Sequence, residues 1–284
     1  PLYLYLRKNK NKILFTYLLT SLPIFIVKFF NFQNKIIFRI SGQIRYSYLR
    51  KMLLSYAEDK IYKVLIQTEF SRKKLTQQKI FNKNKILYLE DPIIDMGKIE
   101  KLKIQKIEKK FTSRKFFIAI GRLTKQKNFI FLIESIKEIL RRKNYSLLIL
   151  GDGEQKDILQ KMIKNYQLEE KIFLLGFKNN TYRYLSKSKG LICSSLWEEP
   201  GFVIQEAAAC KKIILTSNCK SGPSEFLNNG ENGYIFNLND KKSFISCFNQ
   251  MIKEKDKHSK KIKKNFIKCE RYTKKYFAKK IIDE

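Results

Sequence analysis

The sequence predicts an α/β protein with two domains, each built on a parallel sheet covered by helices. The chain has 284 residues, 44% of them hydrophobic, which is enough for two ordinary cores. Short apolar runs typical of buried strands alternate with longer segments of helical periodicity along the whole chain. Because strands and helices that alternate in this way form parallel sheets, we expect two Rossmann-like domains.

The first part of the chain contains four expected strands, at residues 13–17, 36–40, 62–66 and 86–89. Ser21 followed by Pro23 predicts a helix start between the first two, because serine can cap free amides and proline is tolerated in a first turn. Residues 13–27 are uncharged, but they are fewer than the ~20 that a membrane-spanning helix needs, so we expect no span. The chain opens on Pro1 inside a Leu/Tyr-rich run, and we therefore expect the first domain to be incomplete.

A second series of expected strands follows, at residues 116–120, 146–150, 171–175, 190–194, 213–216 and 234–236. Asn128 and Asn239 are expected to begin two helices whose apolar residues recur at steps of three and four. The lysine-rich residues 95–115 are expected to link the domains. We divide the chain into a partial first domain at 1–112, a second domain at 113–266 and a C-terminal helix at 267–284 that packs back on the first domain.

The chain is strongly basic. Lys and Arg number 59 against 26 Asp and Glu, a formal charge of +33, which favours phosphorylated, nucleic-acid or anionic-lipid partners. A lysine bias spread over the whole chain explains the same charge, so the charge does not identify the partner. The five cysteines form no CxxC pair and only His258 could join them, so we expect no metal site and buried free thiols, as in a cytoplasmic protein.

Residues 119–128, AIGRLTKQKN, join an expected strand to a helix start. Gly121 ends the strand, and Arg122 and Lys127 bracket the loop. In parallel α/β sheets ligands bind beyond the carboxyl ends of the strands, where free helix amides and added cations hold phosphate. The segment therefore predicts phosphate binding, with two surface charges on a turn as the alternative.

Two further strand ends belong to the same expected edge of the sheet. Gly151-Asp152-Gly153 is a tight turn without the third glycine of a dinucleotide site, so we interpret it as structural, with close backbone approach to a nucleotide as the alternative. Gly176-Phe177 follows the next strand, and Phe177 is either a core residue or a neighbour of a nucleotide base.

Residues 194–210, SSLWEEPGFVIQEAAAC, carry two carboxylates of interest. Pro200 argues against one continuous helix, so we expect Glu198 in a loop over the strand end and Glu206 one to two turns into a helix, with the amides of residues 201–203 between them. Carboxylates accept hydrogen bonds from sugar hydroxyls, and helix amides suit phosphate oxygens. The segment thus has groups for each part of a nucleotide sugar, with a chance pair of glutamates as the alternative.

After the next strand, residues 221–227 (SGPSEFL) predict another helix start at Gly222-Pro223, and residues 229–236 (NGENGYIF) predict a turn and a strand. Turn architecture and ligand binding explain these glycines equally well.

Taken in order, the segments GRLTKQKN, LILGDG, LLGF, SSLWEEPGFVIQEA, SGPSEFL and NGENGYIF resemble family 4 glycosyltransferases. The resemblance covers residues 36–284 and is densest over residues 116–240. It implies a GT-B fold, in which two Rossmann-like domains face a cleft, and a retaining transfer of a sugar from a nucleotide-sugar donor. The pattern looks most like enzymes that build bacterial capsule, lipopolysaccharide and other surface glycans, including hexosamine transferases.

The resemblance implies a role for each candidate residue. The catalytic group would be Arg122 and Lys127 at the donor diphosphate, with Glu198 at the transferred sugar. The donor-binding group would be Gly121, Phe177, Gly201, Phe202, Val203 and Glu206. Within that second group, the amides of residues 201–203 contact phosphate or sugar, Glu206 holds the ribose hydroxyls, and the backbone near Phe177 lies by the base. No metal or other cofactor is implied, because cations and amides can stabilise the charge that develops on the leaving diphosphate.

One departure concerns a histidine that the family carries in its N-terminal domain near the donor sugar. The comparable strand end here is RISGQIR, with Ser41 and Gly42 and no histidine. The resemblance therefore leaves open which donor is used and whether any step is assisted by histidine.

We predict a cytoplasmic enzyme that moves a hexose or N-acetylhexosamine to a glycan or polyprenyl-diphosphate-linked acceptor in surface polysaccharide synthesis. Residues 253–280 are strongly basic and carry Ile262, Phe266 and Phe277 at near-helical spacing. We expect the apolar side to pack against the core and the basic side to meet the anionic inner face of the cell membrane, with solvated charge as the alternative. Two other functions stay open, a basic nucleic-acid binder and an inactive GT-B remnant acting as an interaction module. No RNA or DNA motif supports the first, so we expect no nucleic-acid partner.

Overall fold

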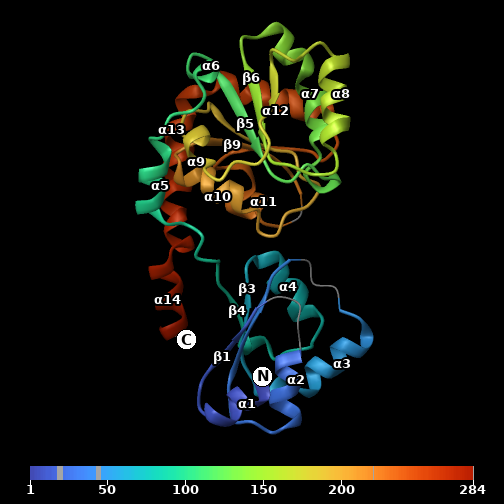
Figure 1. Cartoon of the computed structure of the whole chain (residues 1–284), viewed down its shortest axis with the longest axis vertical. Helices are drawn as coiled ribbons and strands as arrows, with labels where there is room; N and C mark the ends of the chain where they lie inside the picture. The colour runs from blue at the N-terminus through green and yellow to red at the C-terminus, as the bar shows by residue number, and fades with distance from the viewer. Residues whose placement is uncertain (18–21, 43–45, 220, 284) are drawn as a thin grey trace. The chain divides into compact units, whose positions relative to one another are not determined.

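The computed structural model describes residues 1–17, 22–42, 46–219 and 221–283. It divides into two compact units, Pro1–Asp91 and Pro92–Glu284, each with its own sheet and hydrophobic core (Figure 1). Every strand pair in both sheets is parallel. The predicted α/β class, with two Rossmann-like parallel-sheet domains, is therefore confirmed.

The first unit contains a four-stranded sheet in the order β1-β2-β3-β4. Its strands are β1 (Leu14–Thr16), β2 (Ile36–Ile40), β3 (Ile61–Ile66) and β4 (Ile86–Tyr88), and its helices are α1 (Leu2–Lys8), α2 (Leu22–Phe29), α3 (Tyr48–Tyr56) and α4 (Glu69–Gln77). The predicted strands are confirmed with closely matching bounds. The predicted cap at Ser21 lies outside the described residues.

Side-chain caps fix where two helices of the first unit begin. The Ser47 hydroxyl accepts a hydrogen bond from the Arg50 amide at 3.3 Å, and the Thr68 hydroxyl accepts one from the Ser71 amide at 3.2 Å. Each cap satisfies an amide that the first turn of a helix leaves without an internal partner. The starts of α3 and α4 are therefore set by residues that precede them.

A buried arginine joins the carboxyl ends of the strands in the first sheet. Arg39 of β2 is fully buried, and its guanidinium donates to the Leu89 carbonyl at 2.6 Å and forms an ion pair with Asp91. The Gln67 side chain donates to the same carboxylate. Because a buried charge without a partner is costly, this cluster ties β2 to the chain segments that follow β3 and β4.

The second unit contains a six-stranded sheet in the order β10-β9-β8-β5-β6-β7. Its strands are β5 (Phe116–Ile120), β6 (Ser146–Leu150), β7 (Ile172–Leu174), β8 (Gly190–Cys193), β9 (Ile213–Ser217) and β10 (Tyr234–Phe236). Its helices are α5 (Met96–Lys103), α6 (Lys109–Thr112), α7 (Phe129–Arg142), α8 (Lys156–Asn165), α9 (Tyr182–Leu185), α10 (Phe202–Ala209), α11 (Pro223–Phe226), α12 (Lys241–Lys253), α13 (Lys255–Lys268) and α14 (Lys274–Asp283). The predicted strands of this unit are also confirmed.

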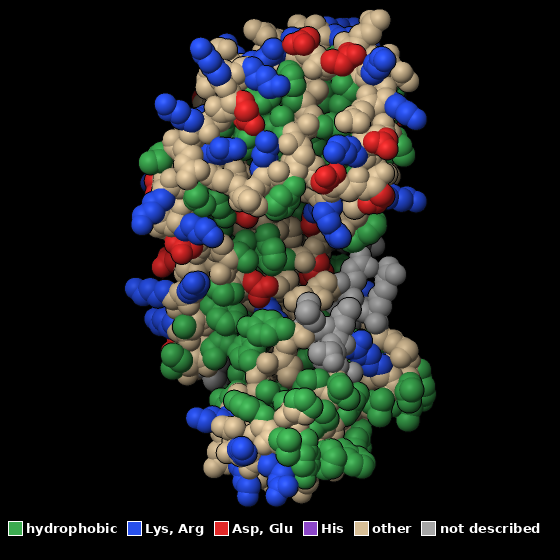
Figure 2. All heavy atoms as spheres, in the orientation of Figure 1, with side chains coloured by type: hydrophobic (Ala, Val, Ile, Leu, Met, Phe, Trp, Pro, Cys, Tyr) green, Lys and Arg blue, Asp and Glu red, His purple; other side chains and the backbone are tan. Residues whose placement is uncertain are grey.

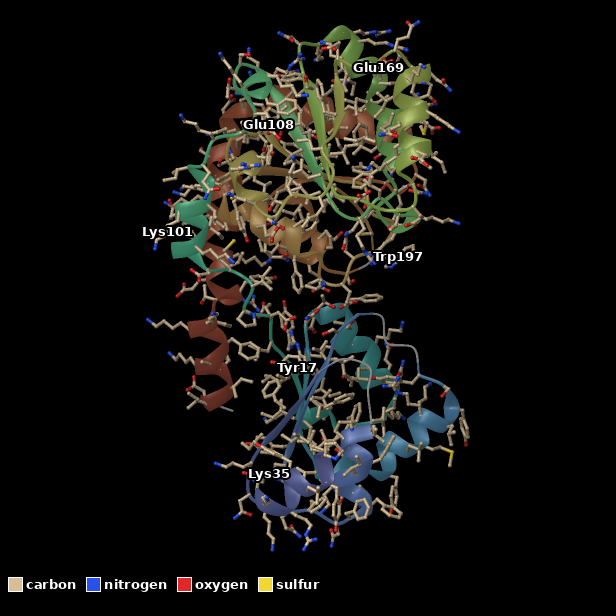
Figure 3. The ribbon with its side chains drawn as sticks, viewed as in Figure 1. Tyr17, Lys35, Lys101, Glu108, Glu169 and Trp197 are labelled. Carbon is tan, nitrogen blue, oxygen red and sulfur yellow. The ribbon has the colours of Figure 1, made fainter. Side chains whose placement is uncertain are left out.

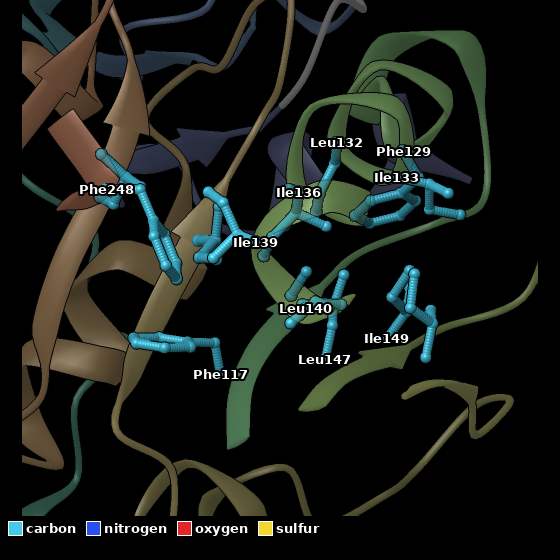
Figure 4. Packing of buried hydrophobic residues seen from close by; sticks show 14 of the residues in the cluster. Phe117, Phe129, Leu132, Ile133, Ile136, Ile139, Leu140, Leu147, Ile149 and Phe248 are labelled. Atoms are coloured by element: carbon cyan, nitrogen blue, oxygen red, sulfur yellow. The ribbon is translucent and has the colours of Figure 1, made fainter. Parts of the chain in front are cut away.

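Figure 4 shows the core layer that α7 and α12 form with the second sheet. The apolar stripe predicted for α7 is buried at every position, from Phe129 to Leu140. Phe248 of α12 meets Phe117 of β5 edge to face, with ring centroids 4.9 Å apart. Helical spacing alone therefore identifies which side of α7 covers the sheet.

The caps found for α7 and α12 differ from the predicted ones. Asn128 occupies the capping position of α7 with a φ of 56°, but its side chain makes no capping bond and donates to the Asn239 side chain at 3.0 Å. The cap of α12 is Asp240, whose carboxylate accepts a hydrogen bond from the Ser243 amide at 2.9 Å. The prediction of Asn239 is thus wrong by one residue, because Asn and Asp cap equally well and the backbone decides between neighbours.

The boundary between the two units lies earlier in the chain than the sequence predicts. The sequence places residues 92–112 in the first domain, much of it as linker, but this stretch packs with the second unit. Asp95 caps α5 by accepting a hydrogen bond from the Lys98 amide at 3.0 Å, and Ile99 and Phe111 are buried in the second unit's core. The division therefore falls after Asp91 rather than after residue 112.

The segment that precedes α5 lies beside the segment that precedes α14. The Ile94 amide donates to the Tyr272 carbonyl at 2.9 Å, and Ile94 forms an isolated parallel bridge with Thr273. Residues on both sides of the predicted second domain therefore belong to one unit. The expectation that residues 267–284 pack back on the first domain stays a prediction.

All five cysteines are free thiols, and four of them are buried, as the sequence predicts. Burial raises the pKa of Cys210 and of Cys269 to about 12, so both thiols stay protonated at neutral pH. In the part of the chain that the structure describes, we find no helix with the length and apolar character needed to cross a membrane.

Several lysines serve the fold itself. The Lys268 ammonium donates to the Glu225 and Phe226 carbonyls at 2.9 and 2.8 Å, at the end of α11. Lys212 donates to the Ser186 carbonyl at 2.6 Å, just after α9. Because cations are favourable beside the last carbonyls of a helix, part of the positive charge of the chain is structural.

Replacing Arg39 by methionine should destabilise the first unit by about 3 to 5 kcal/mol, because the Asp91 carboxylate would keep its part-buried position without its cation. The quantity to measure is the free energy of opening of β2 and β3, by native-state hydrogen exchange with mass spectrometry.

Arg72→Met is the matched control in the same unit. Arg72 pairs with Glu69 on the surface of α4, and both side chains are partly exposed, so this variant should lose less than about 1 kcal/mol. Equal losses in the two variants would show that the Arg39 pair contributes no more than a surface pair does.

Candidate functional site

The order of the strands in the second sheet creates a switch point beside β5. From β5 the chain continues to β6 and β7 on one side, whereas β8, β9 and β10 extend the sheet on the other side. The loops after β5 and β8 therefore leave neighbouring strands in opposite directions. In open α/β sheets ligands bind at such a point, beyond the carboxyl ends of the strands.

Hydrogen bonds join the loop after β5 to the loop after β8. The Ser194 hydroxyl donates to the Lys127 carbonyl at 2.8 Å, and the Leu196 amide donates to the Gln126 carbonyl at 2.8 Å. The Gln126 side chain donates to the carbonyl of Trp197 at 2.9 Å, and Figure 3 labels Trp197 at this edge of the second unit. The side chains on the two loops are thus held in a fixed arrangement.

Lys127 and Glu198 form an ion pair across these loops. Lys127 Nζ lies 2.5 Å from Glu198 Oε1, and the Ser195 hydroxyl donates to the same oxygen at 2.5 Å. The Glu198 side chain is only 6% exposed and that of Lys127 is 17% exposed, so solvent screens the pair weakly. A phosphate that reached this point would compete with Glu198 for the ammonium.

Close packing fixes the loop that carries Glu198. The Ser221 hydroxyl donates to the Glu198 carbonyl at 2.7 Å. Gly222 has a φ of 54°, and a Cβ on it would lie 2.2 Å from the Pro200 carbonyl oxygen. This approach of two backbones requires glycine, so turn architecture explains Gly222.

The helix α10 begins beside the ion pair. Gly201 turns the chain into the helix with a φ of 82°, and a Cβ on it would lie 3.2 Å from Glu198 Cβ. The first amides of a helix have no partner inside the helix, so those of Phe202 and Val203 are placed to bind an anion. The partial positive charge of this helix end adds to the charge of Lys127.

Gly121, Arg122 and Phe177 line a pocket of about 410 Å³. Phe177 is 74% exposed, which excludes it from the core, and Arg122 is exposed as well. The Lys127 side chain passes over Gly121, where a Cβ would lie 2.9 Å from Lys127 Cε. The pocket and the ion pair therefore adjoin.

The Gly151-Asp152-Gly153 turn borders the same pocket. A Cβ on Gly151 would lie 1.8 Å from the Gly121 carbonyl oxygen, and the Asp152 carbonyl accepts a hydrogen bond from the Leu123 amide at 2.9 Å. Both observations agree with the structural interpretation of this turn, which holds the loop after β5 against the end of β6.

Glu206 lies in the second turn of α10 and is half-buried. Burial raises its pKa, and the Tyr182 hydroxyl of α9, which donates to Glu206 Oε1 at 3.4 Å, opposes this rise. Thr181, the residue before Tyr182, lines the pocket. A carboxylate in this position is suited to accept hydrogen bonds from the hydroxyls of a ligand.

The predicted residues lie along one edge of the second sheet, but in two groups. Gly121, Arg122 and Phe177 line the pocket, and Lys127, Glu198 and the start of α10 lie beside it, whereas Glu206 is paired with α9. Sequence reasoning missed Tyr182, Ser195 and Ser221. The two serines lie inside segments that the sequence singles out, but the contact of Tyr182 with Glu206 joins residues 24 apart and has no local signal.

The described residues offer no cluster of side chains that could ligate a metal ion. Across the described ranges of the chain, no three His, Cys, Asp or Glu side chains come together as a metal site would require. That no metal takes part in the reaction stays a prediction.

Comparison with known proteins identifies the family and supports the fold. The family model described as Glycosyl transferases group 1 matches residues 100–268. The N-acetylgalactosamine-N,N'-diacetylbacillosaminyl-diphospho-undecaprenol 4-alpha-N-acetylgalactosaminyltransferase of Campylobacter jejuni is 34% identical over 140 residues, which are 49% of this chain and 38% of that protein. The matching part spans about two fifths of the length of such curated relatives.

Two solved structures share the architecture. A glycosyltransferase from Rickettsia africae has a TM-score of 0.81 at 16% identity, over 99% of this chain and 78% of that one. HepE of Anabaena, solved in complex with UDP, has a TM-score of 0.80 at 16% identity, over 99% of this chain and 80% of that one. The predicted GT-B fold class is thereby confirmed.

Replacing Glu206 by glutamine should stabilise the second unit at neutral pH. Burial raises the folded-state pKa of Glu206 above its ordinary value of 4.5, so the folded state keeps this proton to a higher pH than the unfolded state does. The free energy of unfolding therefore falls as the pH rises from 4.5 through the folded-state pKa. The thermal midpoint of the variant should therefore exceed that of the wild type at neutral pH and converge with it as the pH falls below 4.5.

Differential scanning calorimetry over this pH range measures the effect, with Glu169→Gln as the control. Glu169 is exposed on the second unit (Figure 3), so its replacement should leave the midpoint unchanged throughout. A lower midpoint for Glu206→Gln at neutral pH would show that the ionised carboxylate stabilises the fold.

Proposed function

We propose, from the premise that this chain belongs to the glycosyl transferases group 1 family, that it transfers a sugar from a nucleotide-sugar donor. The observation that carries the proposal is the convergence of Lys127, Arg122 and the start of α10 beside one pocket at the switch point of the second sheet. Two cations and a positive helix end in one place suit the diphosphate of such a donor.

The same groups would lower the barrier to transfer. Negative charge develops on the diphosphate as the bond between donor sugar and phosphate breaks, and donors that are already in position stabilise that charge without rearranging. Hydrogen bonds between the two loops hold Lys127 in such a position. In our proposal the phosphate takes the Lys127 ammonium, and Glu198 then accepts a hydrogen bond from the transferred sugar.

The nucleoside of the donor would bind to the remaining residues of the site, Glu206 and Phe177. Glu206 accepts hydrogen bonds from the ribose hydroxyls, with Tyr182 orienting its carboxylate, and the exposed Phe177 lies near the base. HepE of Anabaena was solved with UDP, which supports a uridine nucleotide as the first donor to test. We propose a hexose or an N-acetylhexosamine as the sugar.

The stereochemistry follows from the resemblance to family 4. We propose retention by front-face attack, in which the acceptor hydroxyl gives its proton to the departing phosphate as the new glycosidic bond forms. This route needs no protein base, and Lys127 and Arg122 supply positive charge that a metal ion would otherwise bring.

The proposal for the acceptor is based on the Campylobacter jejuni relative. The Campylobacter jejuni enzyme acts, by its name, on a glycan linked to diphospho-undecaprenol. We propose a glycan on such a carrier as the acceptor here, in the synthesis of a surface polysaccharide. An acceptor of this kind would place the chain at the cytoplasmic face of the cell membrane, as a peripheral protein.

The substitution Lys127→Ala should weaken binding of the preferred nucleotide sugar by about tenfold to a hundredfold, the effect of losing a hydrogen bond to a charged group. A thermal-shift screen finds the donor, because a ligand that binds the folded state raises its midpoint. Isothermal titration calorimetry then gives the dissociation constants.

Lys125→Ala is the control, because Lys125 lies in the same turn and is exposed. It should bind the donor as the wild type does. Identical affinities of the wild type and Lys127→Ala for every nucleotide sugar would refute the assigned role.

Comparing UDP with the UDP-sugar should separate the two carboxylates. Glu206→Ala should weaken both ligands by about tenfold, because both carry the ribose. Glu198→Gln should weaken the UDP-sugar relative to UDP, because Glu198 is assigned to the sugar. UDP itself should bind at least as tightly as it does to the wild type, because the substitution removes the carboxylate that competes with phosphate for Lys127. Calorimetry on both ligands measures this, and a Glu198→Gln variant that loses UDP affinity would place Glu198 at the nucleotide.

A further inference from the structure

A second pocket lies at the amino ends of the strands in the second sheet. Lys115 precedes β5, Lys189 precedes β8 and Ile213 begins β9, and all three line a cavity of about 350 Å³ that we call the amino-end pocket. Its other lining residues are Phe117, Tyr145, Met251, Ile252, Lys255 and His258. Since β5 spans five residues, or roughly 15 Å, this pocket is separate from the candidate site at the carboxyl ends of the strands.

One part of the lining is apolar and aromatic. Phe117, Ile213 and Met251 are buried and belong to the core of the second unit. The half-buried Tyr145 meets Phe117 edge to face, with ring centroids 5.3 Å apart. An apolar group that entered the amino-end pocket would leave water and contact these side chains, which favours its binding.

The other part of the lining is cationic. Lys115, Lys189 and Lys255 are exposed, and among the described residues none of their ammonium groups forms an ion pair. Lys257, which also belongs to the first turn of α13, differs because its Nζ lies 2.7 Å from Glu254 Oε1. An ammonium group without a carboxylate partner is available to an anionic ligand.

A cation on the surface of this chain does not by itself indicate a site. Figure 2 shows Lys and Arg side chains over the visible face of the second unit with Asp and Glu side chains among them. Three other pockets of this unit each have an acid in their lining, namely Glu270, Glu231 and Asp152. Among the described residues that line the amino-end pocket, by contrast, none is Asp or Glu. The lining therefore attracts an anion at three ammonium groups and repels it nowhere.

Two neighbouring groups add to the polar character of the pocket. Burial lowers the pKa of the Lys212 ammonium, and the charge of Lys189 lowers it further, so positive charge is concentrated at this end of the sheet. His258 is half-buried, and its Nε2 lies 2.9 Å from the Met251 carbonyl oxygen. Because a carbonyl accepts, Nε2 is the donor in this bond, and Nδ1 is the ring nitrogen left to bind a ligand.

The size and lining of the pocket restrict the ligand. A cavity of about 350 Å³ has the size of a small-molecule site. Inorganic phosphate would use the ammonium groups but leave Phe117 and Tyr145 without a contact, and an uncharged ring would do the reverse. A phosphate ester supplies about two negative charges and several acceptor oxygens, and an aromatic ring on it can join the edge-to-face contacts of the lining.

We propose that the amino-end pocket is a second ligand site, which binds a small phosphate ester that carries an aromatic ring. The phosphate oxygens accept hydrogen bonds from Lys115, Lys189 and Lys255, and the ring packs against Phe117 and Tyr145. This inference goes beyond the proposed function and does not depend on it, because it uses the opposite end of the sheet.

Isothermal titration calorimetry of the whole chain with phenyl phosphate tests the proposal. The wild type should bind phenyl phosphate, and it should bind inorganic phosphate and phenol at least about tenfold more weakly, because each of these carries only one of the two recognised groups. The variant Lys115→Gln/Lys189→Gln should bind phenyl phosphate about tenfold or more weakly than the wild type does. Since both side chains are exposed, this variant should keep the wild-type thermal midpoint.

Two further variants locate the ligand. Lys161→Gln/Lys164→Gln is the matched control, because it removes the same charge from two exposed lysines of α8, and it should bind phenyl phosphate as the wild type does. Lys127→Ala alters the candidate site and should also bind phenyl phosphate as the wild type does. A loss of phenyl phosphate affinity in Lys127→Ala would place this ligand in the candidate site and overturn the proposal.

Other results would also overturn the proposal. One is an equal loss of affinity in the two double variants, because net charge alone would then hold the ligand. Another is a wild type that does not bind phenyl phosphate, or that binds inorganic phosphate equally well. Titrations with nucleotide sugars on the same preparations distinguish this inference from the proposed function. Lys115→Gln/Lys189→Gln should keep the wild-type affinity for the donor, so the binding of donor and of phenyl phosphate can each fail alone.

Discussion

The candidate site depends on the ion pair between Lys127 and Glu198. It joins the loops after β5 and β8, and hydrogen bonds from Ser195 and Ser221 hold the carboxylate and its backbone in place. A weakly exposed ion pair is tolerated when further hydrogen bonds satisfy its partners. The pair orders the two loops. In the proposed function it also holds a cation beside the pocket, and the transferred sugar must then supply the hydrogen bonds that Glu198 loses when phosphate takes the ammonium.

Buried polar groups in the two units serve different ends. Arg39 meets Asp91 and the Leu89 carbonyl, so its charge is compensated within the first unit. Glu206 receives a hydrogen bond from the Tyr182 hydroxyl, yet burial still raises its pKa. A carboxylate with so little compensation costs stability, and proteins tolerate such a cost where activity requires it. Burial also raises the pKa of Asp91 in the Arg39 cluster, so the assignment of Glu206 to a ligand rests on the proposed function.

The positive charge of the chain has several uses that composition cannot separate. Lys268 bonds to carbonyls at a helix end, Lys127 pairs with a carboxylate, and Arg50 lies over the ring of Tyr46. Each use depends on what surrounds the cation in space. A charge of +33 therefore indicates anionic partners without showing which cations meet them.

Local patterns were enough to place the strands of both sheets, the buried stripe of α7 and the segments that form the site, because periodicity and turn residues act over a few positions. Other features came from contacts between residues far apart in the chain. These include the packing of residues 92–112 with the second unit, the pairing of Tyr182 with Glu206 and the exposure of the apolar side chains of Tyr48, Leu49 and Met52 on α3. A helix pattern shows that an apolar side exists, but the neighbouring elements decide whether that side is covered.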